Sequence, residues 1–335
     1  MDFSVVKLLQ DHFFGQIPEP SVPLDGRTCI VTGSNQGIGY ATVVHFAKQN
    51  AARIIIACRT TSKGQDAAAK VYKDVPTFRG LVDVFELDQA NFSSVIAFAD
   101  KVKKETSRLD ILVLNAGISS WDWNTTKDGW EEVLQVNSLS PGLLALLLLP
   151  KLANSKTTPP GAVPMKPHIT LVTSKRLYVA QFAQQDEPGS LLDALNNPKL
   201  HNERDKYNTT KLLVLFLARQ IAALPSSSGI VVNAVDPGAN RSEGAWNELS
   251  RIMPRPVVWC GLWKLEDEET ADIRMHPFLA STTETKPGAY ISIGKETLTS
   301  RYSVSEKGLW MERKFWEEST ALYKNLVPEV AQSLR

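Results

Sequence analysis

The sequence has few cysteines, no metal-binding motif and no long charged tail. Its 335 residues include three cysteines, Cys29, Cys58 and Cys260. Scattered thiols cannot build a disulfide framework, and two of them fall in apolar strand-like runs. We therefore expect reduced thiols and a reducing, cytoplasmic compartment. The histidines lie far apart, and neither an HExxH nor a CxxC spacing occurs, so no metal site is expected.

The charge is balanced, and no apolar run is long enough to span a membrane. There are 37 Lys and Arg against 36 Asp and Glu, which gives no electrostatic footprint for nucleic acid or an anionic membrane. The most apolar run, 141–150, is about half the length of a membrane span and indicates a buried helix. Residues 1–20 have no basic leader and resemble a short amphipathic helix that ends at Pro18. We expect no nucleic-acid partner and no membrane span.

Apolar strand-like runs alternate with helical patterns along the chain. Strands are expected at 27–33, 53–59, 80–88, 110–117, 168–174, 229–238 and 288–294, with helices at 38–50, 62–73, 92–102, 127–152 and 207–224. Continuously apolar strands indicate a parallel sheet covered on both faces. The predicted fold class is α/β: one Rossmann-type, doubly wound parallel sheet of about seven strands, with helices on both faces and a C-terminal substrate cap. Ligands bind such sheets at the carboxyl ends of the strands.

No break in composition divides the chain. We expect an N-terminal helix and connector at 1–24, followed by a single catalytic domain at 25–335. Within that domain, a polar insertion at 178–205 and a tryptophan-rich lid at 243–265 would flank the mouth of the site. A lid of this composition favours a small hydrophobic substrate, although its tryptophans could equally pack onto the core.

The first strand is followed by the turn TGSNQGIG, which has the mechanics of a phosphate-binding loop. Gly33 permits a tight turn, Gly37 lets backbone approach a pyrophosphate, and Gly39 allows close packing of the next helix on the sheet. The free N–H groups at the start of that helix favour an anion. Asn35 and Ile38 belong to the same predicted cofactor site. A glycine-rich turn without a ligand is the alternative.

The end of the second strand indicates which dinucleotide binds. Arg59 stands there in place of the acidic residue that would bond the ribose diol of NAD, so it would accommodate the 2′-phosphate of NADP, with Lys63 assisting. A solvated arginine at a strand end is the alternative. Asp88 would bond the adenine amino group, or cap the helix that starts near Asn91.

The stretch YNTTK places Tyr207 and Lys211 four residues apart on one helix face. A neighbouring ammonium favours the phenolate and lowers the pKa of a tyrosine from its usual value of about 10. An isolated YxxxK occurs often by chance, so these two residues need further support.

The order of several motifs along the chain gives that support. In this order the chain resembles the short-chain dehydrogenase/reductase superfamily. The motifs are TGSNQGIG, NAG (115–117), Asn137 in LQVNS, Ser174 in LVTS, YNTTK and DPG (236–238). Stretches such as IIIACRTTSKG are similar to the retinol-dehydrogenase-like branch, and the N-terminal region resembles fungal secondary-metabolism reductases. The resemblance implies catalysis by Asn137, Ser174, Tyr207 and Lys211, and cofactor contacts from Asn115, Gly117, Gly238 and Ser242. Two features depart from the family pattern: the long gap between Ser174 and Tyr207, and the sequence PGANRSE, where Ser242 replaces a threonine.

These features predict an NADPH-dependent reduction of a ketone or aldehyde on a hydrophobic metabolite, such as a polyketide or terpenoid intermediate. Ser174 would hold the substrate oxygen, Tyr207 would act as the acid, Lys211 would also bond the nicotinamide ribose, and Asn137 would support a water. The alternatives are alcohol oxidation with NAD(P), a non-redox enzyme with tightly held cofactor, and an inactive dinucleotide-binding relative. The helices at 139–149 and 211–224 are apolar nearly all round, and a homodimer through them is plausible.

Overall fold

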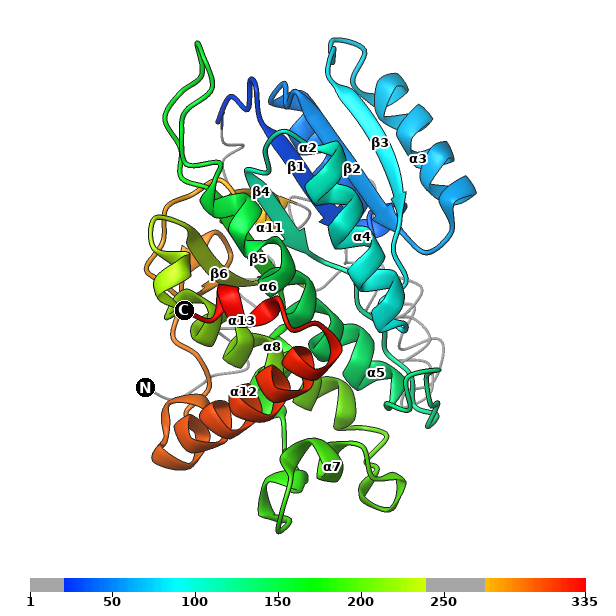
Figure 1. Ribbon diagram of the computed structural model, residues 1–335, viewed down its shortest axis with the longest axis vertical. Helices are drawn as coiled ribbons and strands as arrows, with labels where there is room; N and C mark the ends of the chain where they lie inside the picture. The colour runs from blue at the N-terminus through cyan, green and yellow to red at the C-terminus, as the bar shows by residue number, and fades with distance from the viewer. Residues whose placement is uncertain (1–20, 239–274) are drawn as a thin grey trace, which may run out of the picture.

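One eight-stranded sheet forms the centre of the computed structural model, which describes residues 21–238 and 275–335 (Figure 1). The strands are β1 (Thr28–Thr32), β2 (Arg53–Cys58), β3 (Leu81–Glu86), β4 (Ile111–Leu114), β5 (His168–Val172), β6 (Val231–Asp236), β7 (Ala289–Ser292) and β8 (Lys295–Glu296). Their order is β3-β2-β1-β4-β5-β6-β7-β8. The first seven pair in parallel, as predicted, and the two-residue β8 adds an unforeseen antiparallel edge.

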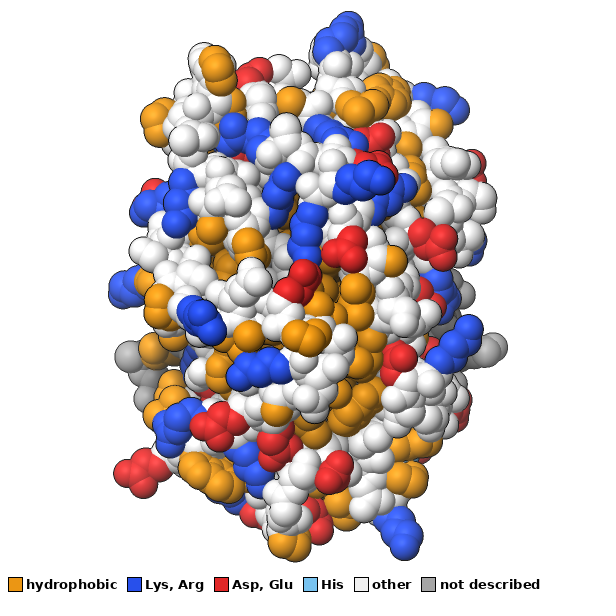
Figure 2. Space-filling model, viewed as in Figure 1, with side chains coloured by type: hydrophobic (Ala, Val, Ile, Leu, Met, Phe, Trp, Pro, Cys, Tyr) orange, Lys and Arg blue, Asp and Glu red, His pale blue; other side chains and the backbone are white. Residues whose placement is uncertain are grey.

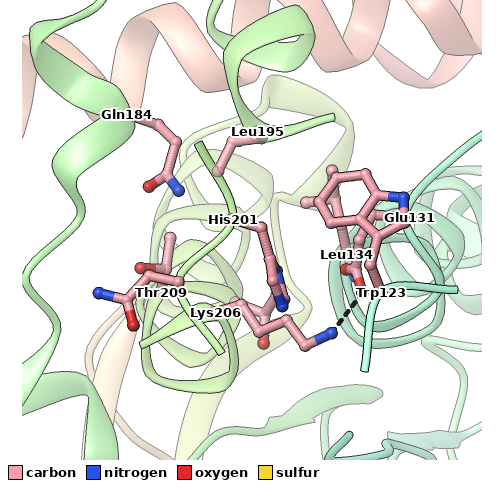
Figure 3. A pocket seen from close by; sticks show the side chains of 10 residues that line it. Trp123, Glu131, Leu134, Gln184, Leu195, His201, Lys206 and Thr209 are labelled. Carbon is pink, nitrogen blue, oxygen red and sulfur yellow. Dashed lines mark hydrogen bonds and ion pairs between the residues drawn. The ribbon is translucent and has the colours of Figure 1, made fainter. Parts of the chain in front are cut away.

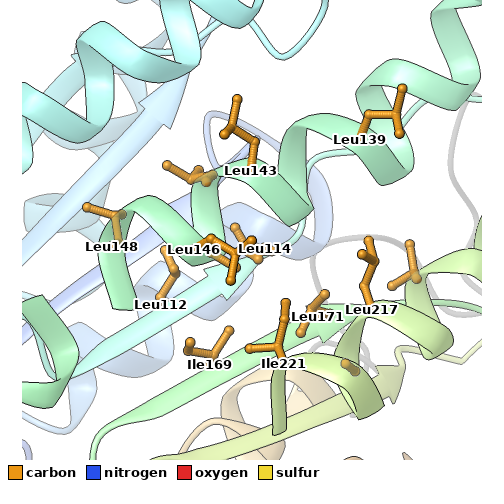
Figure 4. Packing of buried hydrophobic residues seen from close by; sticks show 14 of the residues in the cluster. Leu112, Leu114, Leu139, Leu143, Leu146, Leu148, Ile169, Leu171, Leu217 and Ile221 are labelled. Carbon is orange, nitrogen blue, oxygen red and sulfur yellow. The ribbon is translucent and has the colours of Figure 1, made fainter. Parts of the chain in front are cut away.

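Helices cover both faces of the sheet. On one face lie α4 (Phe92–Glu105), α6 (Ser140–Ala153) and α8 (Lys206–Ala222), which share one hydrophobic cluster with the sheet. Figure 4 shows this cluster, with leucines of α6 packed against β4 and β5. On the other face lie α2 (Gly37–Lys48), α3 (Thr61–Asp74) and α11 (Met275–Ala280). The predicted doubly wound arrangement is confirmed.

The helix predicted from Lys127 begins later than expected. Residues 126–130 form a turn in which Gly129 has a left-handed φ of 84° and the Thr126 N–H donates to the Trp130 carbonyl. Helix therefore starts with the short α5 (Glu132–Leu134), passes through a π-helical turn, η1 (Gln135–Leu139), and continues as α6. Among the described residues, Glu132–Ala153 is the one stretch apolar and long enough to span a membrane, but 94% of its apolar window is buried in the protein.

A long C-terminal helix explains why α6 and α8 are apolar nearly all round. Helix α12 (Glu306–Leu326), which the sequence analysis did not foresee, packs on α8, and the short α13 (Val330–Ser333) packs on α6. The contact is close, because a Cβ on Gly142 of α6 would lie 2.5 Å from the Tyr323 hydroxyl oxygen. These apolar surfaces are therefore buried within one chain.

The polar insertion at 178–205 consists of short helices and turns: η2 (Lys175–Val179), η3 (Ala183–Asp186), α7 (Leu191–Leu195) and η4 (Pro198–Leu200). It is held to α12 by the Glu318 carboxylate, which accepts hydrogen bonds from the Ser190 hydroxyl and from the backbone N–H groups of Leu191 and Leu192. On the face seen in Figure 2, basic and acidic side chains are intermixed. The predicted N-terminal helix, the lid at 243–265 and Cys260 lie outside the described residues, while Cys29 and Cys58 are buried free thiols.

Candidate active site

The glycine turn between β1 and α2 has the conformation that its sequence requires. Gly33 and Gly37 have left-handed φ values of 64° and 60°, which L side chains rarely adopt. A Cβ on Gly39 would lie 2.6 Å from both the Asn115 side-chain nitrogen and the Gly33 carbonyl oxygen. The side chain of the N-cap residue Gln36 does not cap α2, and the first turn of the helix has no acidic residue. Its N–H groups are therefore left for an anion. Asn35 and Ile38 lie half-buried in the same turn.

Arg59 and Lys63 are both exposed, at the end of β2 and in the first turn of α3. Helix α3 also lacks a side-chain cap, so this end of the sheet presents two cations and a second set of N–H groups. Asp88 does not cap the helix near Asn91, which was the alternative role. Asn91 is itself the N-cap of α4, whereas Asp88 accepts a hydrogen bond from the Ala90 N–H in a local turn.

The NAG segment lies directly beside the glycine turn. The Asn115 side chain donates to the Thr32 carbonyl at 2.9 Å, and Thr32 Oγ1 accepts from the Asn115 and Ala116 N–H groups. Gly117 lies farther along, where a Cβ would come within 3.2 Å of Asn137 Oδ1 and 3.3 Å of Lys211 Nζ. The lack of a side chain at Gly117 therefore leaves space beside two of the predicted catalytic residues.

Asn137 sits in the π-helical turn η1 and is buried. Its Oδ1 accepts from the Ile118 N–H at 2.8 Å, and its Nδ2 donates to the Ile118 carbonyl at 2.9 Å and to Thr210 Oγ1 at 3.1 Å. The amide therefore joins the segment after NAG to α8. This amide is hydrogen-bonded to backbone, and that role does not exclude a catalytic one.

Lys211 and Tyr207 lie together on α8. The Lys211 ammonium is buried, donates to the Val172 carbonyl at 3.0 Å, and lies 5.6 Å from the centroid of the Tyr207 ring. Burial lowers the pKa of Lys211 from 10.5 to about 8, because the apolar surroundings disfavour its charge. Tyr207 itself is only half-buried. The buried Lys211 ammonium therefore lies next to the Tyr207 phenol, which is partly accessible to solvent.

Ser174 follows β5 and is half-buried, with its Oγ accepting from the Arg176 N–H at 3.3 Å. The segment around it is fixed on both sides. Thr173 Oγ1 donates to the Lys211 carbonyl at 2.6 Å, and the Lys175 N–H donates to Asp236 Oδ1 at 3.1 Å. Ser174 is thus tied to the helix that carries Tyr207 and to β6.

Two further features of the site were not predicted from the sequence. Asp236 was noted only as part of DPG, but its buried carboxylate holds the Lys175 backbone and accepts from the Ser292 hydroxyl at 3.1 Å. A buried ion pair between Lys206 and Glu131, at 3.0 Å, was also missed, because nothing local in the sequence links residues so far apart. Gly238 has a left-handed φ of 83°, and the predicted nicotinamide contact Ser242 lies outside the described residues.

A doubly wound sheet with a glycine turn after its first strand defines a Rossmann-type fold. A family model described as short chain dehydrogenase matches residues 27–159. A short chain dehydrogenase of Arthrobotrys oligospora is 32% identical over 325 residues, covering 92% of this chain and 97% of the relative. One from Emericella nidulans is 32% identical over 284 residues, covering 83% and 87%.

Among solved structures, L-sorbose reductase from Gluconobacter frateurii, in complex with NADPH and L-sorbose, has a TM-score of 0.53 at 21% identity, covering 72% of this chain and 81% of the reductase. Likeness at that identity shows the fold alone. The relatives identify more: the chain belongs to the short-chain dehydrogenase/reductase family. The resemblance to fungal reductases is confirmed with it.

Proposed function

We propose that this protein is an NADPH-dependent reductase that converts a ketone or aldehyde on a hydrophobic metabolite to an alcohol, with Ser174, Tyr207 and Lys211 as its catalytic residues. The observation that carries the proposal is the buried Lys211 ammonium, 5.6 Å from the centroid of the half-exposed Tyr207 ring. Burying a lysine is costly when it has no acidic partner, and no carboxylate of the described residues forms an ion pair with Lys211. Here its Nζ has the Val172 carbonyl as acceptor, and the tyrosine beside it benefits from the charge.

The residues present fit a nicotinamide dinucleotide. The backbone at Gly33 and Gly37 has left-handed φ values, and the Gln36 side chain does not cap α2. This turn therefore offers backbone N–H groups to a pyrophosphate. The exposed Arg59 and Lys63 suit a 2′-phosphate by charge, which supports NADPH over NADH. Asn115 and Gly117 would line the nicotinamide end. When bound, NADPH supplies the hydride.

The chain's own residues would perform the acid–base and positioning steps. The Ser174 hydroxyl donates a hydrogen bond to the substrate oxygen and orients the carbonyl. Tyr207 donates the proton that this oxygen needs to become an alcohol hydroxyl. Lys211 stabilises the phenolate left behind, because opposite charges a few ångströms apart attract strongly in a buried site. Asn137 holds α8 to the NAG segment and supports a water beside Lys211.

The substrate class and setting belong to the same proposal. We propose a polyketide or terpenoid intermediate as the substrate and the cytoplasm as the setting, on the resemblance of the N-terminal region to fungal secondary-metabolism reductases and the fungal origin of the relatives. Helix α12 covers one side of α8, so a homodimer would need another surface.

Tyr207→Phe tests the mechanism. Removing the phenol proton should lower kcat by about 10²–10⁴-fold, while NADPH binding, followed by nicotinamide fluorescence, stays unchanged. Tyr302→Phe, on a tyrosine outside the site, is the matched control. Turnover is measured as NADPH consumed per alcohol formed, by absorbance and mass spectrometry. Unchanged turnover in Tyr207→Phe would remove this mechanism, and product without NADPH consumption would indicate a non-redox enzyme.

A further inference from the structure

Beside the helix that carries Tyr207, a small cavity adjoins the buried Lys206–Glu131 ion pair (Figure 3). The cavity measures about 20 Å³, enough for one water. Lys206 Nζ lies 3.0 Å from Glu131 Oε1, and the two side chains are only 8% and 3% exposed. Tyr207 is the residue that follows Lys206, so this pair lies at the first turn of the catalytic helix.

Each partner of the pair is also bonded to other parts of the site. Lys206 Nζ donates to the Asp122 carbonyl at 2.6 Å, in the loop after NAG. Glu131 Oε2 accepts from the Leu134 N–H at 2.7 Å and so caps the helix that leads to Asn137. The Glu131 N–H donates to Asn196 Oδ1 at 2.7 Å, which brings in the insertion at 178–205. One ion pair therefore joins four segments.

His201 docks the insertion at the same cavity. Its Nε2 lies 3.0 Å from the Trp121 carbonyl oxygen, and its ring meets Trp123 edge-on at 5.3 Å. A carbonyl only accepts, so Nε2 carries the hydrogen and Nδ1 of the neutral ring is an acceptor. Within residues 21–238 and 275–335, that Nδ1 is buried without a hydrogen-bond partner, as is Gln184 Oε1, and both residues line the cavity. A water in the cavity suits such acceptors.

The backbone N–H groups of the first turn of α8 donate no hydrogen bond to the N-cap side chain. Asp205 precedes the helix, but its side chain does not cap it. Its carboxylate accepts from the N–H groups of Gln181 and Phe182 at 3.0 and 2.9 Å. It binds the first turn only through side chains, accepting from Asn208 Nδ2 at 3.1 Å and Thr209 Oγ1 at 3.0 Å. A buried ion pair contributes little net stability compared with an apolar pair of the same shape. What this pair supplies is a fixed geometry.

We propose that Lys206 and Glu131 are positioning residues, which fix the first turn of α8 and thereby set the Tyr207 hydroxyl relative to Lys211 and Asn137. The inference rests on the function proposed above. Misplacement of a reacting group by 1 Å can reduce a rate by about a hundredfold. The pair therefore governs kcat and leaves the Kd for NADPH unchanged, because the proposed phosphate contacts, at the glycine turn and at Arg59, do not involve either residue.

The test removes both charges together. Lys206→Met alone would strand a buried carboxylate and risk misfolding, whereas the double variant Lys206→Met/Glu131→Gln keeps an oxygen for the Leu134 N–H. It should lower kcat about 10- to 100-fold at an unchanged Kd for NADPH. The single variant Lys206→Arg, which keeps both charges of the pair, should retain most of the rate. Leu215→Ala, a buried change farther along α8, is the matched control and should lower the melting temperature with kcat retained.

A second readout needs no turnover. The tyrosines are replaced by 3-fluorotyrosine, and the Tyr207 signal in the ¹⁹F NMR spectrum is assigned with Tyr207→Phe. In the folded double variant this signal should shift and broaden. An unchanged signal together with wild-type kcat would overturn the inference. If the wild-type protein reduces no carbonyl, the proposed function fails, while the NMR signal still decides whether the pair positions Tyr207.

Discussion

Replacing Lys211 by methionine should abolish turnover and yet make the protein more stable. The Lys211 side chain is buried, and burial lowers its pKa from 10.5 to about 8. One pH unit corresponds to roughly 1.4 kcal/mol, so keeping this ammonium charged at pH 7 costs about 3 kcal/mol of folding free energy. Methionine fills a similar volume with an unbranched, uncharged chain, which removes that cost.

A smaller term opposes the gain. The hydrogen bond from Lys211 Nζ to the Val172 carbonyl, 3.0 Å long, is lost, and such a bond contributes about 1 kcal/mol. The net stabilisation at pH 7 should be about 2 kcal/mol, which raises the melting temperature of a chain of this length by about 3 °C. Differential scanning calorimetry measures the melting temperature, and NADPH oxidation measures activity on the same samples.

The pH dependence provides the decisive control. The pKa of Lys211 is lower in the folded state than in the unfolded state, so the cost is fully present below pH 8 and disappears as the pH rises toward 10.5. Lys211→Met should therefore lose its advantage over the wild type near pH 10, where only the missing hydrogen bond remains. Lys199→Met, at an exposed lysine, should show no such trend. The reasoning is refuted if Lys211→Met is less stable at pH 7, or if its advantage is the same at both pH values.

Three further predictions concern activity and packing. The kcat for reduction should fall about tenfold per pH unit above pH 8, because Lys211, whose pKa is about 8, loses its proton there; a flat profile to pH 10 contradicts this. Arg59→Leu should raise the KM for NADPH at least tenfold and leave that for NADH unchanged, since a charge-assisted hydrogen bond is lost; wild-type preference for NADH would contradict the assignment. Gly142→Ala should lower the melting temperature, because its Cβ would lie 2.5 Å from the Tyr323 hydroxyl oxygen. Tyr323→Phe should restore most of that loss, and no rescue would mean that another contact is responsible.

Local signals made the sheet and the glycine turn predictable. The strand 53–58 reads RIIIAC, and a run buried on both faces of a sheet carries its hydrophobicity without alternation. Gly33 and Gly37 are glycine because the backbone there has positive φ. Tyr207 and Lys211 are four residues apart on one helix, so their proximity follows from helical geometry alone.

The remaining parts depend on contacts between distant residues. Helix α12 is amphipathic, and its apolar side packs on α8. The sequence of α12 alone does not show which helix it will cover. The Glu131–Lys206 pair spans 75 positions, and a single sequence holds no signal that joins them. Asp88 failed as an N-cap because Asn91, closer to the helix, holds the capping hydrogen bond.

The helical segment around Asn137 cannot be predicted correctly from a regular α-helical periodicity. A reading with 3.6 residues per turn assumes one continuous apolar face, but η1 widens the turn at Gln135–Leu139. Such a turn has weaker backbone geometry and needs compensation. Asn137 provides it through two hydrogen bonds to the Ile118 backbone and one to Thr210. If the π-helical turn exists to aim this amide, Asn137→Ala should leave the N–H and carbonyl of Ile118 without this partner and convert the turn to regular α-helix, while Thr210 Oγ1 keeps its hydrogen bond to the Tyr207 carbonyl. The resulting rotation of Gln135 and Leu134 would disturb the cap at Glu131 and, through Lys206, the helix that carries Tyr207.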